Sequence, residues 1–152
     1  MNYKRIMVAV DGSETSDSAF LEALNLTKLL QAELCIVTVV APFPLRNVAI
    51  GADIDRCQVI NRNDSQTILD HLKDIAQQKN INAEIKLIEM ADTTTTISEK
   101  IIEVAETWHT DLIVIGTHGK QGFRRLVLGS VAEGTARRSS IPVMLVRAKE
   151  NQ

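Results

Sequence analysis

Five short apolar runs alternate along the chain with segments whose apolar residues recur at helical spacing. The runs are residues 6–10, 34–40, 85–90, 112–115 and 143–146. All except 85–90 are nearly continuous rather than alternating, which is typical of strands that are covered on both faces. The pattern therefore predicts five strands of a buried sheet.

The segments between the runs predict helices, because their apolar residues follow the i, i+3, i+4 rule. The first three apolar faces are Ala19, Ala23, Leu26 and Leu30; Ile68, Leu72, Ile75 and Ala76; and Ile97, Ile101, Val104, Ala105 and Trp108. A fourth, short helix begins near Ser130 and ends before Ser139, Ser140 and Pro142. Thr96–Glu99 and Ser130–Glu133 each have the spacing of a capping box.

Strand and helix alternation predicts an α/β fold with a parallel sheet and right-handed crossovers. A length of 152 residues is most simply one domain, residues 1–152. The segment 41–63 breaks the pattern, because it holds Pro42, Pro44 and Gly51 and shows no clean periodicity. We expect it to be a long loop that serves as a lid or an interface arm, or that is disordered.

Composition narrows the class of protein. Hydrophobic residues make up 45% and charged residues 24%, as in ordinary globular proteins, and the low aromatic content of 3% predicts an aliphatic core. A net charge of -2 gives no reason to expect nucleic acid as a partner. The first apolar run is too short to span a membrane. Cys35 and Cys57 fit no metal or disulfide spacing, so we expect a cytoplasmic protein.

A glycine motif follows the fourth apolar run and suggests a phosphate site. Gly116-Thr117-His118-Gly119 is followed by nine residues and then by Gly129-Ser130. Glycines allow the backbone to approach an anion, and the N–H groups of Ser130 and Val131 at the start of a helix can bind it. The basic residues 120, 124 and 125 between the glycines could neutralise a polyphosphate. Alternatively, the glycines mark turns, Ser130 caps the helix opposite Glu133, and the basic residues form a solvated loop.

Asp11 ends the first apolar run and begins a second motif, Asp11-Gly12-Ser13. Ligands of open α/β sheets bind at the carboxyl ends of strands where the strand order reverses. If the order reverses between the first and fourth strands, Asp11 and the glycine motif flank one crevice. There Asp11 accepts bonds from a ribose or holds a metal, or it only makes the turn into the first helix.

These residues resemble the universal stress proteins of the UspA family, in their ATP-binding branch. The resemblance covers essentially the whole chain and is carried by residues 8–13, 111–119, 129–133 and 141–146, with Gly122 between them. It implies a Rossmann-like (HUP-type) open parallel sheet of five strands in the order 3-2-1-4-5, with helices on both faces. It also implies a homodimer that pairs through the last strand, Val143–Val146.

The resemblance further implies how ATP, ADP or AMP would bind, with Mg²⁺ held by the phosphates near Asp11 and no other metal site. Asp11 would take the ribose. The adenine pocket would be lined by Ala9, Val39 and Ile115. The phosphates would be surrounded by Gly116, Thr117, Gly119, Gly129, Ser130 and Val131. Two positions depart from the family pattern, where residues 89–92 replace a Gly-x-Pro and Gly134 replaces a basic residue.

Three functions remain open. The first is a regulatory module of the stress response that binds an adenine nucleotide as a homodimer. The second is a slow ATP hydrolase, although the chain offers no activated nucleophile, no catalytic residue that we can name and no lysine-bearing P-loop. The third is a protein-interaction dimer with a vestigial site and an unknown partner. Fold alone does not choose between them.

Overall fold

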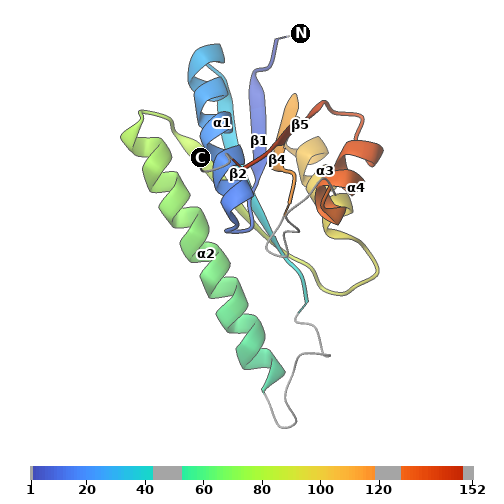
Figure 1. Ribbon diagram of the computed structural model, residues 1–152. Coiled ribbons are helices and arrows are strands. Elements are labelled where there is room, and N and C mark those ends of the chain that lie inside the picture. The colour runs from blue at the N-terminus through green and yellow to red at the C-terminus, as the bar shows by residue number, and fades with distance from the viewer. Residues whose placement is uncertain (1, 43–52, 119–127, 149–152) are drawn as a thin grey trace.

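The computed structural model describes residues 2–42, 53–118 and 128–148. Strands and helices alternate along the chain as its apolar pattern predicts (Figure 1). The strands are β1 (Arg5–Ala9), β2 (Glu33–Val40), β3 (Ala83–Glu89), β4 (Leu112–Gly116) and β5 (Val143–Val146). The helices are α1 (Glu14–Leu30), α2 (Ile54–Gln78), α3 (Ile97–Thr107) and α4 (Ser130–Arg138).

The strands of the described residues form one five-stranded parallel sheet in the order β3-β2-β1-β4-β5. The central strand is β1, where Ala9 lies opposite Val37 of β2 and Ile115 of β4. Helices α1 and α2 cover one face, and α3 and α4 cover the other (Figure 1). The predicted fold class and strand order are therefore confirmed.

Alternate residues of the inner strands fill two aliphatic cores. On β1, Ile6 and Val8 point towards α1 and α2, whereas Met7 and Ala9 point towards α3 and α4. Both sets are buried, which explains why these strands read as continuous apolar runs. Cys35 lies in the second core as a free cysteine, and burial raises the pKa of its thiol to about 12. It is an inert apolar residue.

The expectation of a loop over the whole of 41–63 is wrong, because α2 already begins at Ile54. The side chain of Asp53 caps this helix by accepting a hydrogen bond from the N–H of Arg56 at 3.2 Å. The first turns carry many polar residues and hide the helical period in the sequence. No helix of residues 2–42, 53–118 and 128–148 is both long and apolar enough to cross a membrane.

The last strand is less covered than its apolar sequence predicts. Val143, Met144 and Val146 are half-buried, and Leu145 is 39% exposed. The carbonyl oxygens of Pro142 and Val146 accept hydrogen bonds from the neighbouring strand, so the backbone of Val143 and Leu145 faces the other way. β5 is therefore an edge strand whose outer side presents apolar residues.

Candidate functional site

The carboxyl ends of β1 and β4 lie side by side in the sheet. Ala9 and Ile115 are register partners, so Asp11 and Gly116 follow two adjacent strands at the same edge. This is the arrangement that the sequence predicts, because the strand order reverses between β1 and β4. Two motifs that are far apart in the sequence therefore meet at one place.

Asp11 makes the turn into α1. Its Oδ1 accepts a hydrogen bond from the N–H of Ser13 at 2.9 Å, and its own N–H donates to Ser16 Oγ at 3.3 Å. Ser13 is the N-cap residue of α1, and its hydroxyl accepts from the N–H of Ser16. The turn role is thus confirmed, and the role towards a ribose remains a prediction.

Gly116 lets the end of β4 touch the start of α1. A Cβ atom at this position would lie 2.8 Å from the carbonyl carbon of Thr15 and 2.9 Å from its oxygen. The Thr15 hydroxyl also donates a hydrogen bond to the carbonyl oxygen of His118. Sequence reasoning missed Thr15, because a threonine in the first turn of a helix gives no signal beyond helix capping. The hydrogen bond from Thr15 to His118 joins α1 to the glycine motif.

Thr117 connects the end of β4 to β5 and to α4. Its N–H donates to the carbonyl oxygen of Val146 at 2.9 Å, and its own carbonyl accepts from the N–H of Gly129 at 2.7 Å. Its hydroxyl lies 3.0 Å from His118 Nδ1 in a hydrogen bond. The residue is 7% exposed. Gly129, and with it the start of α4, is therefore fixed beside Gly116.

The start of α4 differs from the capping box that the sequence suggests. Gly129 is the N-cap residue, Ser130 is the first residue of the helix, and no side chain in the described part of the protein caps it. Glu133 instead pairs with Arg137 at 2.9 Å. The capping role of Ser130 is wrong, because the residue lies one position too far along the helix. As far as the described side chains are concerned, the first N–H groups of α4, those of Ser130 and Val131 included, can therefore bind an anion.

The predicted adenine residues lie at the same edge on the α3 and α4 side. Ala9 and Ile115 are 7% and 5% exposed, and Val39 is half-buried against the same core. The structure thus brings Ala9, Val39, Ile115, Gly129 and Val131 to one side of the sheet. Gly119, Gly122 and the basic residues 120, 124 and 125 lie outside the described residues.

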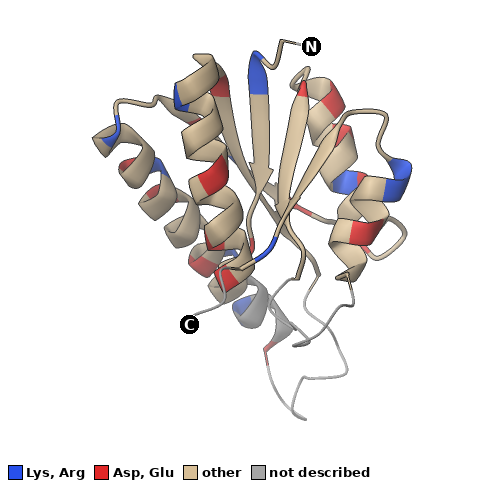
Figure 2. Ribbon diagram, turned by 45° about the horizontal axis from the view of Figure 1, so that its top comes forward, with Lys and Arg blue, Asp and Glu red and all other residues tan. Residues whose placement is uncertain are grey.

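Charge differs between the two helix starts that meet here. Acidic residues lie along α1, whereas α4 has Glu133 in its first turn and basic residues at its other end (Figure 2). Burial raises the pKa of Asp17, and repulsion from Asp11 and Glu14 adds to the effect against the attraction of His71. The start of α1, with Glu14, Asp17 and the preceding Asp11, therefore carries more negative charge than the start of α4, where Glu133 alone opposes the positive end of the helix dipole. No group of three metal-ligating side chains occurs among the described residues.

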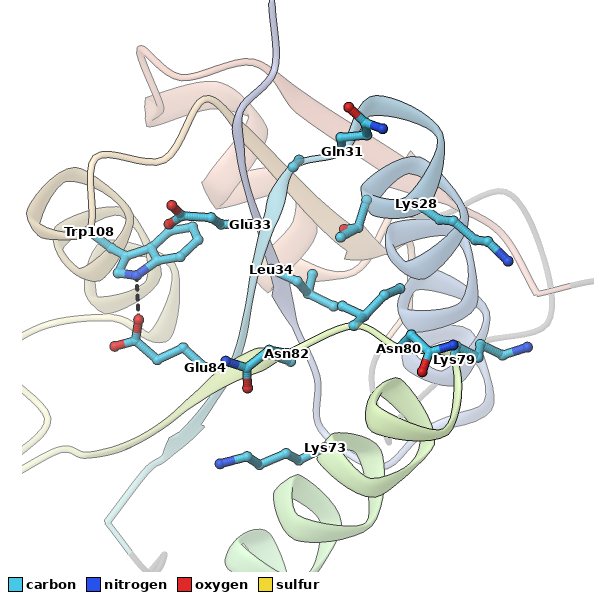
Figure 3. Close-up of a pocket in the computed structure, with 14 residues that line it drawn as sticks. Lys28, Gln31, Glu33, Leu34, Lys73, Lys79, Asn80, Asn82, Glu84 and Trp108 are labelled. Atoms are coloured by element: carbon cyan, nitrogen blue, oxygen red, sulfur yellow. Dashed lines mark hydrogen bonds between the residues drawn. The ribbon is translucent and has the colours of Figure 1, made fainter.

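A separate groove of about 910 Å³ lies at the opposite end of the sheet (Figure 3). It is lined by the ends of α1, α2 and α3, with Lys28, Lys73 and Lys79 around a floor that includes Leu34. Lys28 in the last turn of α1 and Lys79 at the C-cap of α2 complement the negative ends of the helix dipoles. The groove is distant from the glycine motif, and two of its three lysines are explained by the helix ends.

Trp108 closes one side of this groove and belongs to the core, as the sequence predicts. It is 6% exposed, its Nε1–H donates to Glu84 Oε2 at 2.8 Å, and the Arg5 guanidinium lies 4.2 Å from the ring centroid. The hydrogen bond from Trp108, followed by that from Lys86, holds the pKa of Glu84 below its usual range. Both His71 and His109 are exposed.

Glu84 should therefore make stability depend on pH in the acid range. A depressed carboxyl pKa stabilises the folded state above the unfolded-state value, and this contribution is lost as the pH falls from about 5 to about 3. Glu84→Gln should flatten that part of the profile, because glutamine accepts the Trp108 N–H without titrating. Urea unfolding followed by the fluorescence of the single tryptophan measures it. An unchanged profile would contradict the assignment.

The sequence matches the model of the Universal stress protein family over residues 2–147. The chain belongs to this family. Two universal stress proteins are each 29% identical to it: MJ0531 of Methanocaldococcus jannaschii, over 99% of this chain and 85% of that protein, and YxiE of Bacillus subtilis, over 95% and 99%.

Solved universal stress proteins share the fold. UspA from Lactobacillus plantarum superposes with a TM-score of 0.82 at 21% identity, over 97% of this chain and 99% of that one. A universal stress protein in complex with cAMP superposes with a TM-score of 0.71 at 24% identity, over 98% of this chain and 100% of that one. The universal stress protein from Archaeoglobus fulgidus in complex with dAMP superposes with a TM-score of 0.65 at 20% identity, over 96% of this chain and 99% of that one.

The two departures of this universal stress protein from the family pattern have different surroundings. Met90, in the segment that replaces Gly-x-Pro, is buried, and its N–H donates to the carbonyl oxygen of Val40 at 2.9 Å. The segment therefore continues the backbone pairing of β3 with β2. Gly134 lies inside α4, buried against α3.

Proposed function

We propose that this protein is a regulatory module of the stress response that binds an adenine nucleotide at the carboxyl edge of β1 and β4. The observation that carries the proposal is the start of α4, which no side chain of residues 2–42, 53–118 and 128–148 caps and which the hydrogen bond from Gly129 to Thr117 fixes beside Gly116. An uncapped helix terminus next to a close backbone approach is a favourable place for a phosphate. The cAMP and dAMP held by two proteins of the same fold are both adenine nucleotides.

The charge difference between the helix starts orients the proposed ligand. Phosphates would lie at α4, against Gly116, Thr117, Gly119, Gly129, Ser130 and Val131. The ribose would lie at Asp11, whose carboxylate can accept hydroxyl hydrogen bonds and whose charge disfavours phosphate. The adenine would pack on Ala9, Val39 and Ile115. We propose ATP as the ligand, with ADP or AMP as alternatives and Mg²⁺ carried by the phosphates near Asp11.

Mass spectrometry of small molecules released on denaturation of the freshly purified protein tests the proposal. We expect an adenine nucleotide from the wild type and none from Gly129→Glu, whose carboxylate occupies the phosphate position. If neither protein releases a nucleotide, titration with ATP, ADP and AMP at millimolar concentration follows. Absence of binding there would overturn the proposed function.

We also propose that the protein acts in the cytoplasm as a homodimer that pairs through Val143–Val146. The outer backbone of β5 and the exposed Leu145 support this, because an apolar edge strand is a template for pairing. Replacing Leu145 with lysine should give a monomer, since two like charges would meet at the paired edge. Light scattering after size-exclusion chromatography measures the mass. A dimer in the Leu145→Lys variant would place the contact elsewhere.

A further inference from the structure

Gly134 lies in the middle of α4 and in direct contact with α3. A Cβ atom at this position would be 2.5 Å from Ser98 Oγ and 3.0 Å from Ser98 Cβ. Ser98 is 5% exposed, and its hydroxyl lies 3.1 Å from the hydroxyl of Thr96. Glycine is a poor choice for the interior of a helix, so a nine-residue helix that carries it needs a compensating reason. The contact with Ser98 supplies one, because only glycine permits this approach.

Two further contacts hold α4 in place at its ends. At the end of the helix, Arg138 Nη1 lies 2.7 Å from Glu99 Oε1 on α3. Glu99 is itself fixed, because its Oε2 accepts from the N–H of Thr96 at 2.7 Å and its N–H donates to the Thr96 hydroxyl at 3.2 Å. At the start of the helix, Gly129 is bonded to Thr117. Between these anchors, the distance from α4 to α3 is set by Gly134 and Ser98.

We propose that Gly134 is a positioning residue for the nucleotide site, acting with Ser98. By allowing α4 to lie close on α3, Gly134 directs the first N–H groups of α4 at the phosphates. This proposal rests on the proposed function. A methyl group at residue 134 would push the helix off α3 by a few tenths of an ångström, and the first N–H groups lie only about 6 Å away along the helix. They would move with it, because the helix is a rigid unit.

Calorimetric titration of the Gly134→Ala variant of the full chain with AMP and with adenosine tests the proposal. We expect the Kd for AMP to rise about tenfold, the effect of weakening one hydrogen bond to a charged group. The Kd for adenosine should stay the same, because adenosine has no phosphate. Thermal stability should change little, because the better helix propensity of alanine offsets the steric cost of the added methyl group. A merely structural role would change both ligands or neither.

Three further variants separate the effect of helix position from that of helix propensity. The double variant Gly134→Ala with Ser98→Gly removes the opposing side chain and should restore AMP binding to the wild-type value. Ala136→Gly alters the helix propensity of α4 at an exposed position that does not face α3, and AMP binding should be unchanged. Ser98→Thr adds a methyl group to the same contact from α3 and should weaken AMP binding as Gly134→Ala does.

The outcomes distinguish this inference from the function on which it rests. If the wild type binds neither AMP nor ATP, the proposed function fails, and the positioning role fails with it. If the wild type binds AMP and Gly134→Ala binds it equally well, the positioning role is overturned while the proposed function stands. Equal weakening of AMP and adenosine, or no rescue by Ser98→Gly, would also overturn it.

Discussion

Replacing Gly129 with glutamate should weaken ATP binding by about 100-fold or more, equivalent to at least about 2.7 kcal/mol. The new carboxylate would stand at the N-cap position of α4, where no described side chain now caps the helix. It would accept the N–H groups that the phosphate needs, and its charge would repel the phosphate. Calorimetric titration with ATP measures the loss.

Gly129→Ala is the matched control for this variant. Gly129 has φ -60° and ψ 151°, a conformation open to every residue, so alanine adds neither backbone strain nor charge. We expect its ATP affinity to stay within a few-fold of the wild type. If Gly129→Glu bound ATP with wild-type affinity, the phosphates would not bind at the start of α4. If both variants lost ATP affinity equally, the cause would be a general disturbance of the turn.

Replacing Gly116 with valine should lower the free energy of unfolding by about 3 kcal/mol. The Cβ atom would lie within 3 Å of the main-chain carbonyl group of Thr15, and a main-chain group cannot rotate aside as a side chain can. The start of α1 must then move away from β4. The hydrogen bond from the Thr15 hydroxyl to His118 would be lost with it.

Urea denaturation measures this effect, and Thr15→Ala separates its two causes. Thr15→Ala removes the hydrogen bond without any steric clash and should cost about 1 kcal/mol. The larger loss in Gly116→Val then reports the clash itself. A Gly116→Val protein as stable as the wild type would show that the ends of β4 and α1 can separate freely. The site would then lack the rigid base that we describe.

The apolar pattern was sufficient to predict the sheet because both of its faces are buried. Strands β1, β2 and β4 carry continuous apolar runs, and this is the sequence signal of two-sided cover. The edge strand β5 has the same composition but only half of the burial, since an apolar sequence does not show whether a neighbour lies on both sides. The start of α2 was missed because its polar turns carry no apolar period.

The site was predicted in part. Asp11 and the glycines Gly116 and Gly129 were expected at one edge because the family resemblance implies the strand order 3-2-1-4-5 and ligands of open α/β sheets bind where the order reverses. Motif spacing could not place the start of α4, since Ser130 with Glu133 has the spacing of a capping box and only backbone angles show that Gly129 is the N-cap. Contacts between distant residues, such as Thr15 with His118 and Ser98 with Gly134, leave no local pattern in the sequence.

The hydrogen bond between Thr117 and Gly129 also bears on how such a site can diversify. It joins the two ends of the segment 118–128 at its base, so the helix terminus is fixed whatever lies between. The entropic cost of lengthening a closed loop grows slowly, by about 0.6 kcal/mol for each doubling of its length. The start of α4 can therefore keep its position while the sequence between these two anchors changes.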